Sequence, residues 1–270
     1  MDERVVLFGD ELGLDAIEQS LGKEEDFAPV AVVYSSGRTA AEPIAKRIAF
    51  KYHCEAIEQP FAKSENYDDF VRAVSMLNPT LGICCSYDKI IKQEVLSLFQ
   101  KGIFNLHGAL LPKYRGGAVL NWALINGETK TGMTLHKMVE KVDAGPIALQ
   151  KEVLIDRKDT AVTLREKLNN AAIELLPEFW KMVRSQELVL IEQDEAEATY
   201  VRCRKPEDGW FNWNESAEKI YNMIRALVYP WPGAWYMAGQ EKHIIQTFVE
   251  YEEVVRMKQE FEKNGIIENH

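Results

Sequence analysis

An asparagine and a histidine stand two residues apart at the end of an apolar run in the middle of the chain. Asn105 and His107 would leave a β-strand on the same face, because side chains alternate along a strand. A second apolar run, residues 132–138, leads into a loop that holds Asp143. An amide, an imidazole and a carboxylate are what acyl transfer needs: an oxyanion donor, a base and a partner that orients the base.

Each of these three residues, taken alone, has an ordinary structural explanation. Asn105 could cap or turn the chain, and His107 could be a hydrogen-bonded structural histidine. Asp143, followed by Ala-Gly-Pro, could form a simple turn. The prediction of a catalytic site therefore depends on the combination and on the residues around it.

The surrounding residues form a longer pattern. Residues 105–116 read Asn-Leu-His-Gly-Ala-Leu-Leu-Pro-Lys-Tyr-Arg-Gly, residues 132–138 read Gly-Met-Thr-Leu-His-Lys-Met, and residues 143–147 read Asp-Ala-Gly-Pro-Ile. This pattern resembles the N10-formyltetrahydrofolate-dependent formyltransferases. That family includes methionyl-tRNA formyltransferase, glycinamide ribonucleotide transformylase and the sugar N-formyltransferases. The resemblance extends from about residue 5 to about residue 235 and implies that Asn105, His107 and Asp143 are catalytic.

The resemblance also implies where the formyl donor, N10-formyltetrahydrofolate, would bind. Its pteridine would lie against the backbone that follows the fourth strand, and the loop before Asp143 would close the other side. The folate-binding residues expected on this basis are Ser86, Tyr87, Asp88, Lys89, Ile90, Ile91, Val139 and Val142. No Cys or His cluster has the spacing of metal ligands, so we expect no metal.

The loop after His107 is the expected substrate side of the site. Lys113, Arg115 and Gly116 are the candidate substrate-binding residues, since cations there can pair with a diphosphate. Arg115 could instead form a buried structural ion pair, and the sequence leaves this open. In the sugar-nucleotide group an Arg often follows Arg-Gly, whereas this chain has Gly117, a departure that bears on the diphosphate contacts.

The first two-thirds of the chain alternate short apolar runs with helix-period stretches, which predicts an α/β fold. We expect a doubly wound, mostly parallel, Rossmann-like sheet over residues 1–195, with the three catalytic side chains converging at the carboxyl edge of its strands. Residues 192–198 are acidic and polar and suggest a linker. Residues 196–270 would form a small C-terminal β-rich (truncated OB-like) domain, its aromatic residues closing a core, with a charged helical tail.

The amino-acid composition limits the kinds of molecule that we expect this protein to bind. The formal net charge is −10, which disfavours a polyanionic partner because nucleic-acid binding rests on cationic patches. No apolar run is long enough to span a membrane, and the first residues lack the pattern of a signal peptide. We therefore expect a cytoplasmic protein that binds neither nucleic acid nor membrane. A homodimer is compatible with the sequence, which does not decide the oligomeric state.

Three readings of the function follow. We favour a sugar N-formyltransferase that formylates the amine of a UDP- or dTDP-linked amino-sugar for surface polysaccharide synthesis. The alternative enzyme is methionyl-tRNA formyltransferase, but the chain lacks a basic insertion after the second strand and is short after residue 195. A non-catalytic folate- or nucleotide-binding relative is the third reading. It is disfavoured because a retired site has no physical reason to keep all three catalytic residues.

Overall fold

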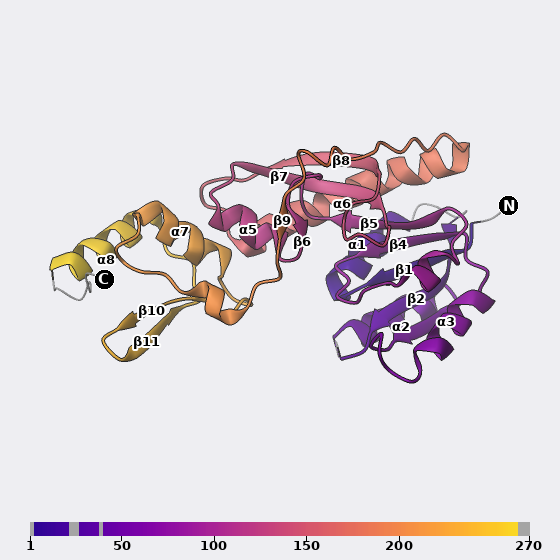
Figure 1. The fold of residues 1–270 in the computed structure, drawn as a ribbon, viewed down its shortest axis with the longest axis horizontal. Helices are drawn as coiled ribbons and strands as arrows, with labels where there is room; N and C mark the ends of the chain where they lie inside the picture. The colour runs from indigo at the N-terminus through magenta and orange to yellow at the C-terminus, as the bar shows by residue number, and fades with distance from the viewer. Residues whose placement is uncertain (1–2, 22–26, 38–39, 264–270) are drawn as a thin grey trace. The chain divides into compact units, whose positions relative to one another are not determined.

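Short apolar strands alternate with helices through the N-terminal half of the chain. The computed structural model describes residues 3–21, 27–37 and 40–263. It contains a seven-stranded sheet with the strand order β3-β2-β1-β4-β5-β7-β8 (Figure 1). The strands are β1 (Val5–Gly9), β2 (Pro29–Ser35), β3 (Glu55–Gln59), β4 (Leu81–Cys85), β5 (Gly102–His107), β7 (Lys130–Lys137) and β8 (Ile147–Leu154). The first five are parallel to one another, so the predicted α/β class with a mostly parallel sheet is confirmed.

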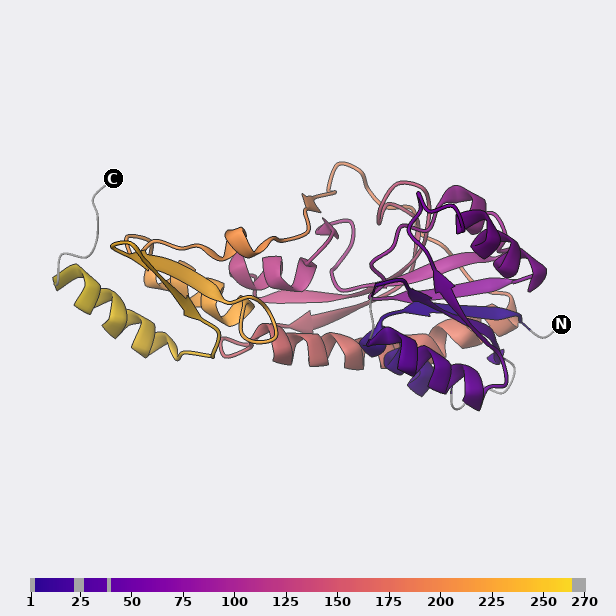
Figure 2. The ribbon, with the colours of Figure 1, turned by 90° about the horizontal axis from the view of Figure 1, so that it is seen from below.

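Helices cover both faces of this sheet (Figure 2). On one face, Val6, Phe8 and Val33 of the strands form a buried core with α3 and α4. On the other, Phe104 of β5 packs against Phe179 of α6, with ring centroids 4.8 Å apart. Burial on both faces explains why the central strands read as continuous apolar runs. The helices are α1 (Glu11–Leu21), α2 (Ala41–Lys51), α3 (Tyr67–Met76), α4 (Gln93–Leu96), α5 (Val119–Ile125) and α6 (Ala161–Ser185).

Strand β7 departs from the expected topology because it runs antiparallel to β5. Asn105 lies opposite His136, and His107 lies opposite Thr134. The end of β7 at Lys137 therefore lies beside Phe104, before Asn105 and His107 of β5. The expectation that the loop to Asp143 leaves from the carboxyl edge shared with β5 is wrong, because an apolar run does not encode the direction of its strand. Asp143 reaches the site because this loop folds back.

The C-terminal part of the chain holds a hairpin and two helices. Trp213 is buried between Phe211 and Tyr236, and its ring stacks on Phe261 at 4.6 Å. These aromatic residues close a small core, as their composition suggested. The elements are β9 (Tyr200–Val201), which pairs with β6 (Arg115–Gly116) from the middle of the chain, the 3-10 helix η2 (Pro206–Gly209), α7 (Ala217–Ala226), β10 (Ala234–Ala238), β11 (Glu241–Ile245) and α8 (Tyr251–Lys263).

Contacts divide the chain into two compact units that interleave along the sequence. One comprises residues 1–115, 132–151 and 169–199, and the other comprises residues 116–131, 152–168 and 200–270. The predicted domain boundary at residue 195 stays a prediction. None of the helices in the described ranges is long and apolar enough to cross a membrane.

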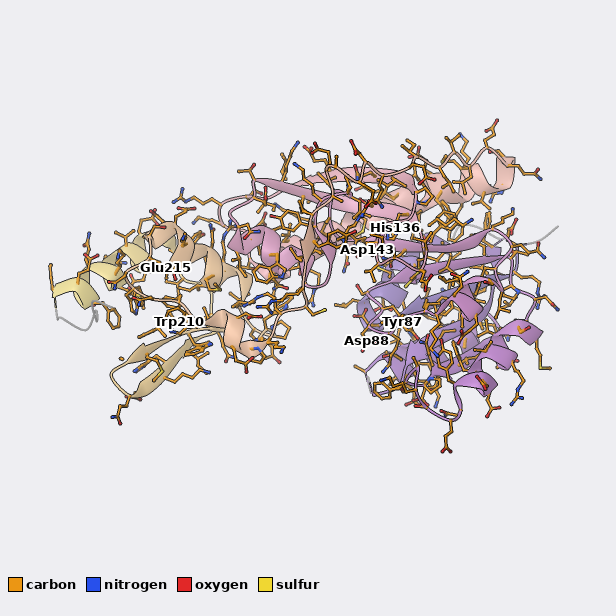
Figure 3. The ribbon with its side chains drawn as sticks, viewed as in Figure 1. Tyr87, Asp88, His136, Asp143, Trp210 and Glu215 are labelled. Carbon is orange, nitrogen blue, oxygen red and sulfur yellow. The ribbon has the colours of Figure 1, made fainter. Side chains whose placement is uncertain are left out.

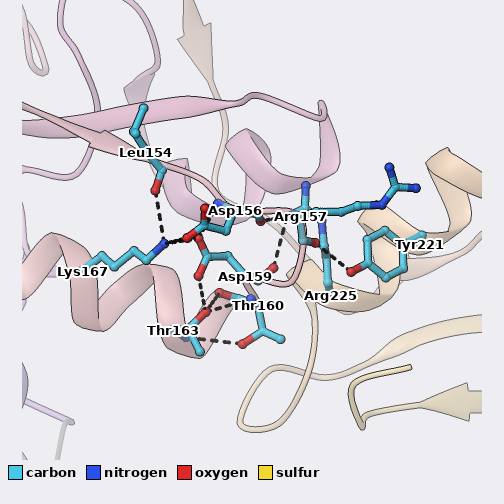
Figure 4. A network of polar contacts seen from close by, with 9 residues as sticks. All are labelled: Leu154, Asp156, Arg157, Asp159, Thr160, Thr163, Lys167, Tyr221 and Arg225. Atoms are coloured by element: carbon cyan, nitrogen blue, oxygen red, sulfur yellow. Dashed lines mark hydrogen bonds and ion pairs between the residues drawn. The ribbon is translucent and has the colours of Figure 1, made fainter. Parts of the chain in front are cut away.

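A polar network ties together the loop before α6 and helix α7 (Figure 4). Arg225 is buried and donates to the backbone carbonyls of Asp156 and Asp159 at 3.3 and 3.1 Å. The Asp159 carboxylate in turn accepts from the Asp156 amide, the Thr163 hydroxyl and the Lys167 ammonium at 2.6 to 2.9 Å. Buried polar groups in this network therefore have their partners inside it.

Candidate active site

The pairing of β5 with β7 places a second histidine beside Asn105. Residues directly opposite one another on antiparallel strands point to the same face, so His136 shares the face of Asn105. The Asn105 Nδ2 atom lies 3.3 Å from His136 Nε2. His136 Nδ1 lies 3.2 Å from its neighbour's backbone carbonyl at Lys137, which can only accept, so Nδ1 carries a proton. With the Nδ1–H tautomer, Nε2 can accept a hydrogen bond from the Asn105 amide.

His107 is buried and is fixed by a backbone carbonyl. Its Nε2 atom lies 2.8 Å from the carbonyl oxygen of Tyr114. Because a carbonyl only accepts, Nε2 donates, and the lone pair of the neutral ring is on Nδ1. Nδ1 faces Asp143, with 3.5 Å between it and Oδ2. The atom that can take up a proton is therefore on the Asp143 side of the ring.

The Asp143 carboxylate lies between the two imidazoles. Its Oδ1 atom is 3.4 Å from His136 Nε2, while Oδ2 faces His107, and only 11% of the side chain is exposed. Figure 3 shows Asp143 and His136 close together. The structure thus brings together the three residues that the sequence singled out and adds His136 as a fourth.

Burial sets the charge state of His107. It lowers the pKa of His107 from the ordinary value of 6.5, and the Asp143 carboxylate and the Tyr114 carbonyl oppose that shift. The ring is therefore neutral near pH 7 and available as a base. Asp143 would stabilise the imidazolium once the proton has been taken up.

A glutamine holds the backbone of the Asp143 loop. Gln193 Nε2 donates to the carbonyl oxygens of Asp143 and Gly145 at 2.8 and 2.7 Å. The Gln193 Oε1 atom accepts from Arg115, whose side chain is fully buried. Arg115 also pairs with Glu195 at 2.8 Å. Residues 192–198, which composition suggested as a linker, thus contribute to the support of this loop.

Comparison with known proteins identifies the family. The family described as formyl transferase matches residues 3–179, and its C-terminal domain family matches residues 204–267. The chain belongs to the formyl transferase family. The family predicted from the sequence motifs is therefore confirmed.

Several solved structures have the same fold as this formyl transferase. A sugar N-formyltransferase from a Shewanella species is 20% identical, with a TM-score of 0.72, and the match covers 93% of this chain and 99% of that one. A 4-N formyltransferase from Francisella tularensis is 17% identical, with the same TM-score and coverage. An N-formyltransferase from Helicobacter canadensis, in complex with folinic acid and dTDP-3-aminofucose, is 20% identical, with a TM-score of 0.65 over 85% of this chain and 81% of that one.

The segment predicted to bind folate follows β4. Ser86 begins it in a left-handed conformation, with φ of 52°. The Tyr87 hydroxyl donates to Gln59 Oε1 at 2.9 Å, and Gln59 Nε2 donates to the Ile90 carbonyl at 3.1 Å. Ile91 packs into the core. The shape of residues 86–91 is therefore fixed by side-chain contacts from β3 and from the core.

Three apolar side chains of the predicted folate site are exposed. Ile90 is 73% exposed, Val142 is 56% exposed and Val139 is 39% exposed. Asp88 and Lys89 lie between Tyr87 and Ile90, and the Lys89 ammonium sits over the Phe61 ring. Exposed aliphatic side chains on two loops suit a flat aromatic ligand such as a pteridine. Folate contact at these positions stays a prediction.

The predicted substrate residues differ from one another in environment. Lys113 is exposed, and its ammonium has no ion-pair partner among the residues that the structure describes. Arg115 forms the buried pair that the sequence left open as its alternative role, which leaves its guanidinium engaged by Gln193 and Glu195. Gly116 has φ of 109°, and a Cβ there would overlap the Val201 carbonyl. Substrate contact by these three residues stays a prediction.

Gly117 departs from the family pattern for a steric reason that the structure reveals. A Cβ at this position would overlap the Cys203 sulfur. A long side chain such as Arg could not be placed at position 117 unless Cys203 moved.

Two residues of the site were missed as functional candidates in the sequence. His136 lies within the quoted motif, and pairing it with Asn105 requires the register of β5 and β7. Gln193 is separated from Asp143 by 50 residues and lies in a polar stretch without periodicity. No group of three or more His, Cys, Asp or Glu side chains able to hold a metal occurs within the described part of the chain.

Proposed function

We propose that this formyl transferase moves the formyl group of N10-formyltetrahydrofolate to the amine of a nucleoside-diphosphate-linked amino-sugar. The observation that carries the proposal is the arrangement of His107, Asp143 and Asn105: a neutral imidazole with its lone pair toward a carboxylate, beside an amide donor. In the Helicobacter canadensis relative, folinic acid and a dTDP-amino-sugar occupy the complex together. That complex supports both proposed substrates.

The geometry supports a mechanism through a tetrahedral intermediate. The neutral amine attacks the formyl carbon and forms the new C–N bond, while the carbonyl oxygen becomes an oxyanion. An N–H of Asn105 would donate to that oxyanion, an interaction worth about 3–4 kcal/mol of barrier in comparable sites. The attacking nitrogen passes its proton to His107 Nδ1, directly or through one water, and Asp143 stabilises the imidazolium. Collapse breaks the bond to N10, which leaves with a proton.

The donor site would be formed by the segment after β4 and by the loop before Asp143. Residues 86–91 and Val139 and Val142 would contact the folate, with the backbone of the segment reading the pteridine. The exposed aliphatic side chains of Ile90 and Val142 support this placement. These two loops come from the same compact unit as His107.

A small diphosphate suits the acceptor side better than tRNA does. The net charge of −10 opposes extended phosphate binding, whereas one or two cations suffice for a diphosphate. Lys113 is the exposed cation that follows the catalytic strand. We keep a dTDP- or UDP-linked substrate, a cytoplasmic location, a homodimer and a domain boundary near residue 195 as parts of this proposal.

Parallel assays with different acceptors test this function. The protein would be incubated with N10-formyltetrahydrofolate and dTDP-amino-sugars, UDP-amino-sugars or methionyl-tRNA, and formylated product would be measured by mass spectrometry. We expect transfer to an amino-sugar nucleotide, with a rate that depends weakly on salt. Steeply salt-dependent formylation of methionyl-tRNA would support the alternative enzyme. Binding of folate without turnover of any acceptor would support a non-catalytic relative.

A further inference from the structure

The carboxamide of Gln193 uses all its hydrogen-bonding capacity between Arg115 and the Asp143 loop. Its nitrogen donates to the carbonyls of Asp143 and Gly145. Its oxygen accepts from Arg115 Nε at 3.0 Å and from Nη2 at 2.8 Å. An NH₂ group has two donors and a carbonyl oxygen has two lone pairs, so every position of this amide is occupied.

Arg115 fixes which way the Gln193 amide points. A guanidinium can only donate, so the amide oxygen must face Arg115, and the NH₂ group must then face the two backbone carbonyls. Arg115 is itself held by Glu195, and Lys141 donates to the same carboxylate at 2.6 Å. These two cations lower the pKa of Glu195 to about 2, so Glu195 stays charged at neutral pH.

The Asp143 loop has a conformation that needs external support. Asp143 has φ of 52°, in the left-handed region that residues other than glycine seldom occupy. Two residues later, a Cβ at Gly145 would overlap the Lys137 carbonyl, so the backbone passes very close to the end of β7. Such conformations persist when the surrounding structure holds them in place. The two hydrogen bonds from Gln193 are on the carbonyls of these same two residues.

We propose that Gln193 is a positioning residue for the reaction, because it holds Asp143 between His107 and His136. Arg115 acts indirectly, because it fixes the orientation of the Gln193 amide. This inference rests on the proposed function for its effect on turnover. It assigns to Arg115 a role in organising the catalytic loop in place of binding the substrate diphosphate.

Substitution of Gln193 by Glu tests the two donors. A Glu side chain has the same size and still pairs with Arg115, but it has no N–H for the carbonyls of Asp143 and Gly145. We expect Gln193→Glu to lower kcat by about tenfold to a hundredfold, as small misplacements in active sites do. The KM values for folate and sugar nucleotide should change little. The matched control is Glu192→Gln, at the exposed residue next to Gln193, which should leave kcat unchanged.

A second variant provides a readout that does not depend on turnover. Gln193→Met is neutral and of similar length, and Arg115 keeps Glu195 as a partner in it. The groups facing His107 are the Asp143 carboxylate, the His136 ring and the Tyr114 carbonyl, and Asp143 raises the pKa of His107. If Asp143 moves away, NMR titration of the histidines should show His107 protonating at lower pH in Gln193→Met than in the wild-type chain.

The two readouts separate this inference from the proposed function. A wild-type protein that formylates no amino-sugar nucleotide would reject the function, while the titration would still decide the placement of Asp143. Wild-type kcat in both Gln193 variants would overturn the inference. A lower kcat with an unchanged His107 titration would also overturn it, because Asp143 would then have kept its position.

Discussion

The His107–Asp143 site and the Arg225–Asp159 network are both buried and polar, yet they differ in the length of the contacts that their carboxylates make. Asp159 accepts three contacts of 2.6 to 2.9 Å, and Arg225 donates to Asn222 and to two carbonyls at 2.9 to 3.3 Å. Asp143, by contrast, contacts two imidazoles at 3.4 and 3.5 Å. The Asp159 carboxylate is held by short hydrogen bonds, whereas the Asp143 carboxylate makes longer contacts to two rings.

This difference indicates what each region can do. A network of short hydrogen bonds stabilises the fold, because removing a member leaves a buried partner without its hydrogen bond. Long contacts to a shared carboxylate leave His107 able to change its protonation state with little rearrangement. The backbone of the Asp143 loop is instead held by Gln193, whose amide uses all its donors and acceptors. The comparison predicts that substitutions in the two regions affect different measurements.

Substitution of His107 should have the largest effect on turnover. His107→Asn removes the proposed general base, and general base catalysis contributes about a hundredfold to ten-thousandfold. We expect kcat to fall by that range while the thermal melt stays near that of the wild-type protein. Formyl transfer and differential scanning fluorimetry measure the two quantities. His53→Asn, at an exposed histidine, is the matched control and should retain activity.

The pH dependence should report the same group. Burial lowers the pKa of His107, so the acid limb of kcat/KM should have its midpoint below 6.5. In the unfolded chain His107 has its ordinary pKa of 6.5 and binds a proton more tightly than in the folded chain. The contribution of His107 to the free energy of unfolding is therefore complete above pH 6.5 and is lost as the pH falls below that value. Asp143→Asn should move the midpoint further down, since the charge that raises the pKa of His107 is lost. A midpoint that does not move in Asp143→Asn would contradict the contact between the two residues.

Substitution of Arg225 should affect stability without affecting chemistry. Arg225→Met leaves the carbonyls of Asp156 and Asp159 without their donor, which should lower the free energy of unfolding by about 1–3 kcal/mol. The kcat per folded molecule should stay at the wild-type value. Urea unfolding and active-site titration measure these quantities. Arg157→Met, at an arginine whose side chain is largely exposed, is the control with a smaller expected loss. A lower kcat at unchanged stability would show that the two regions do not differ as proposed.

Loss of His136 should have an intermediate effect on turnover. His136→Phe keeps a ring of similar size but removes the acceptor of the Asn105 amide, a hydrogen bond worth about 0.5–1.5 kcal/mol. We expect kcat to fall by about twofold to tenfold, through a less well oriented oxyanion donor. His136→Gln, which can accept through its side-chain oxygen, should restore part of the rate. Equal losses in both variants would indicate that the ring, and not its nitrogen, matters.

Substitution of Lys113 should have the smallest effect. An exposed cation that pairs with a diphosphate contributes about 0.2–1 kcal/mol, so Lys113→Ala should raise the KM for the sugar nucleotide by up to about fivefold. The KM for folate should not change. Lys181→Ala, at another exposed lysine, is the control. If the KM for the sugar nucleotide stays constant in Lys113→Ala, the diphosphate is bound by other residues.

Local pattern alone predicted a large part of this protein. The alternation of apolar runs and helical stretches predicted the α/β class, and the spacing of two residues placed Asn105 and His107 on one face of β5. The motif from residue 105 to residue 147 predicted the family, which is confirmed. These features were readable because each depends on residues close together in the sequence.

Tertiary structure decided the direction of β7, the pairing of His136 with Asn105, the burial of Arg115 and the role of residues 193 and 195. Arg115 and Gln193 are 78 residues apart, and Gln193 and Asp143 are 50 apart. Local periodicity reports which side of an element is buried, but it contains no information on which distant partner will satisfy a buried charge. The partners of Arg115 are determined by the tertiary fold, because a buried guanidinium needs acceptors and the fold determines which acceptors lie near it.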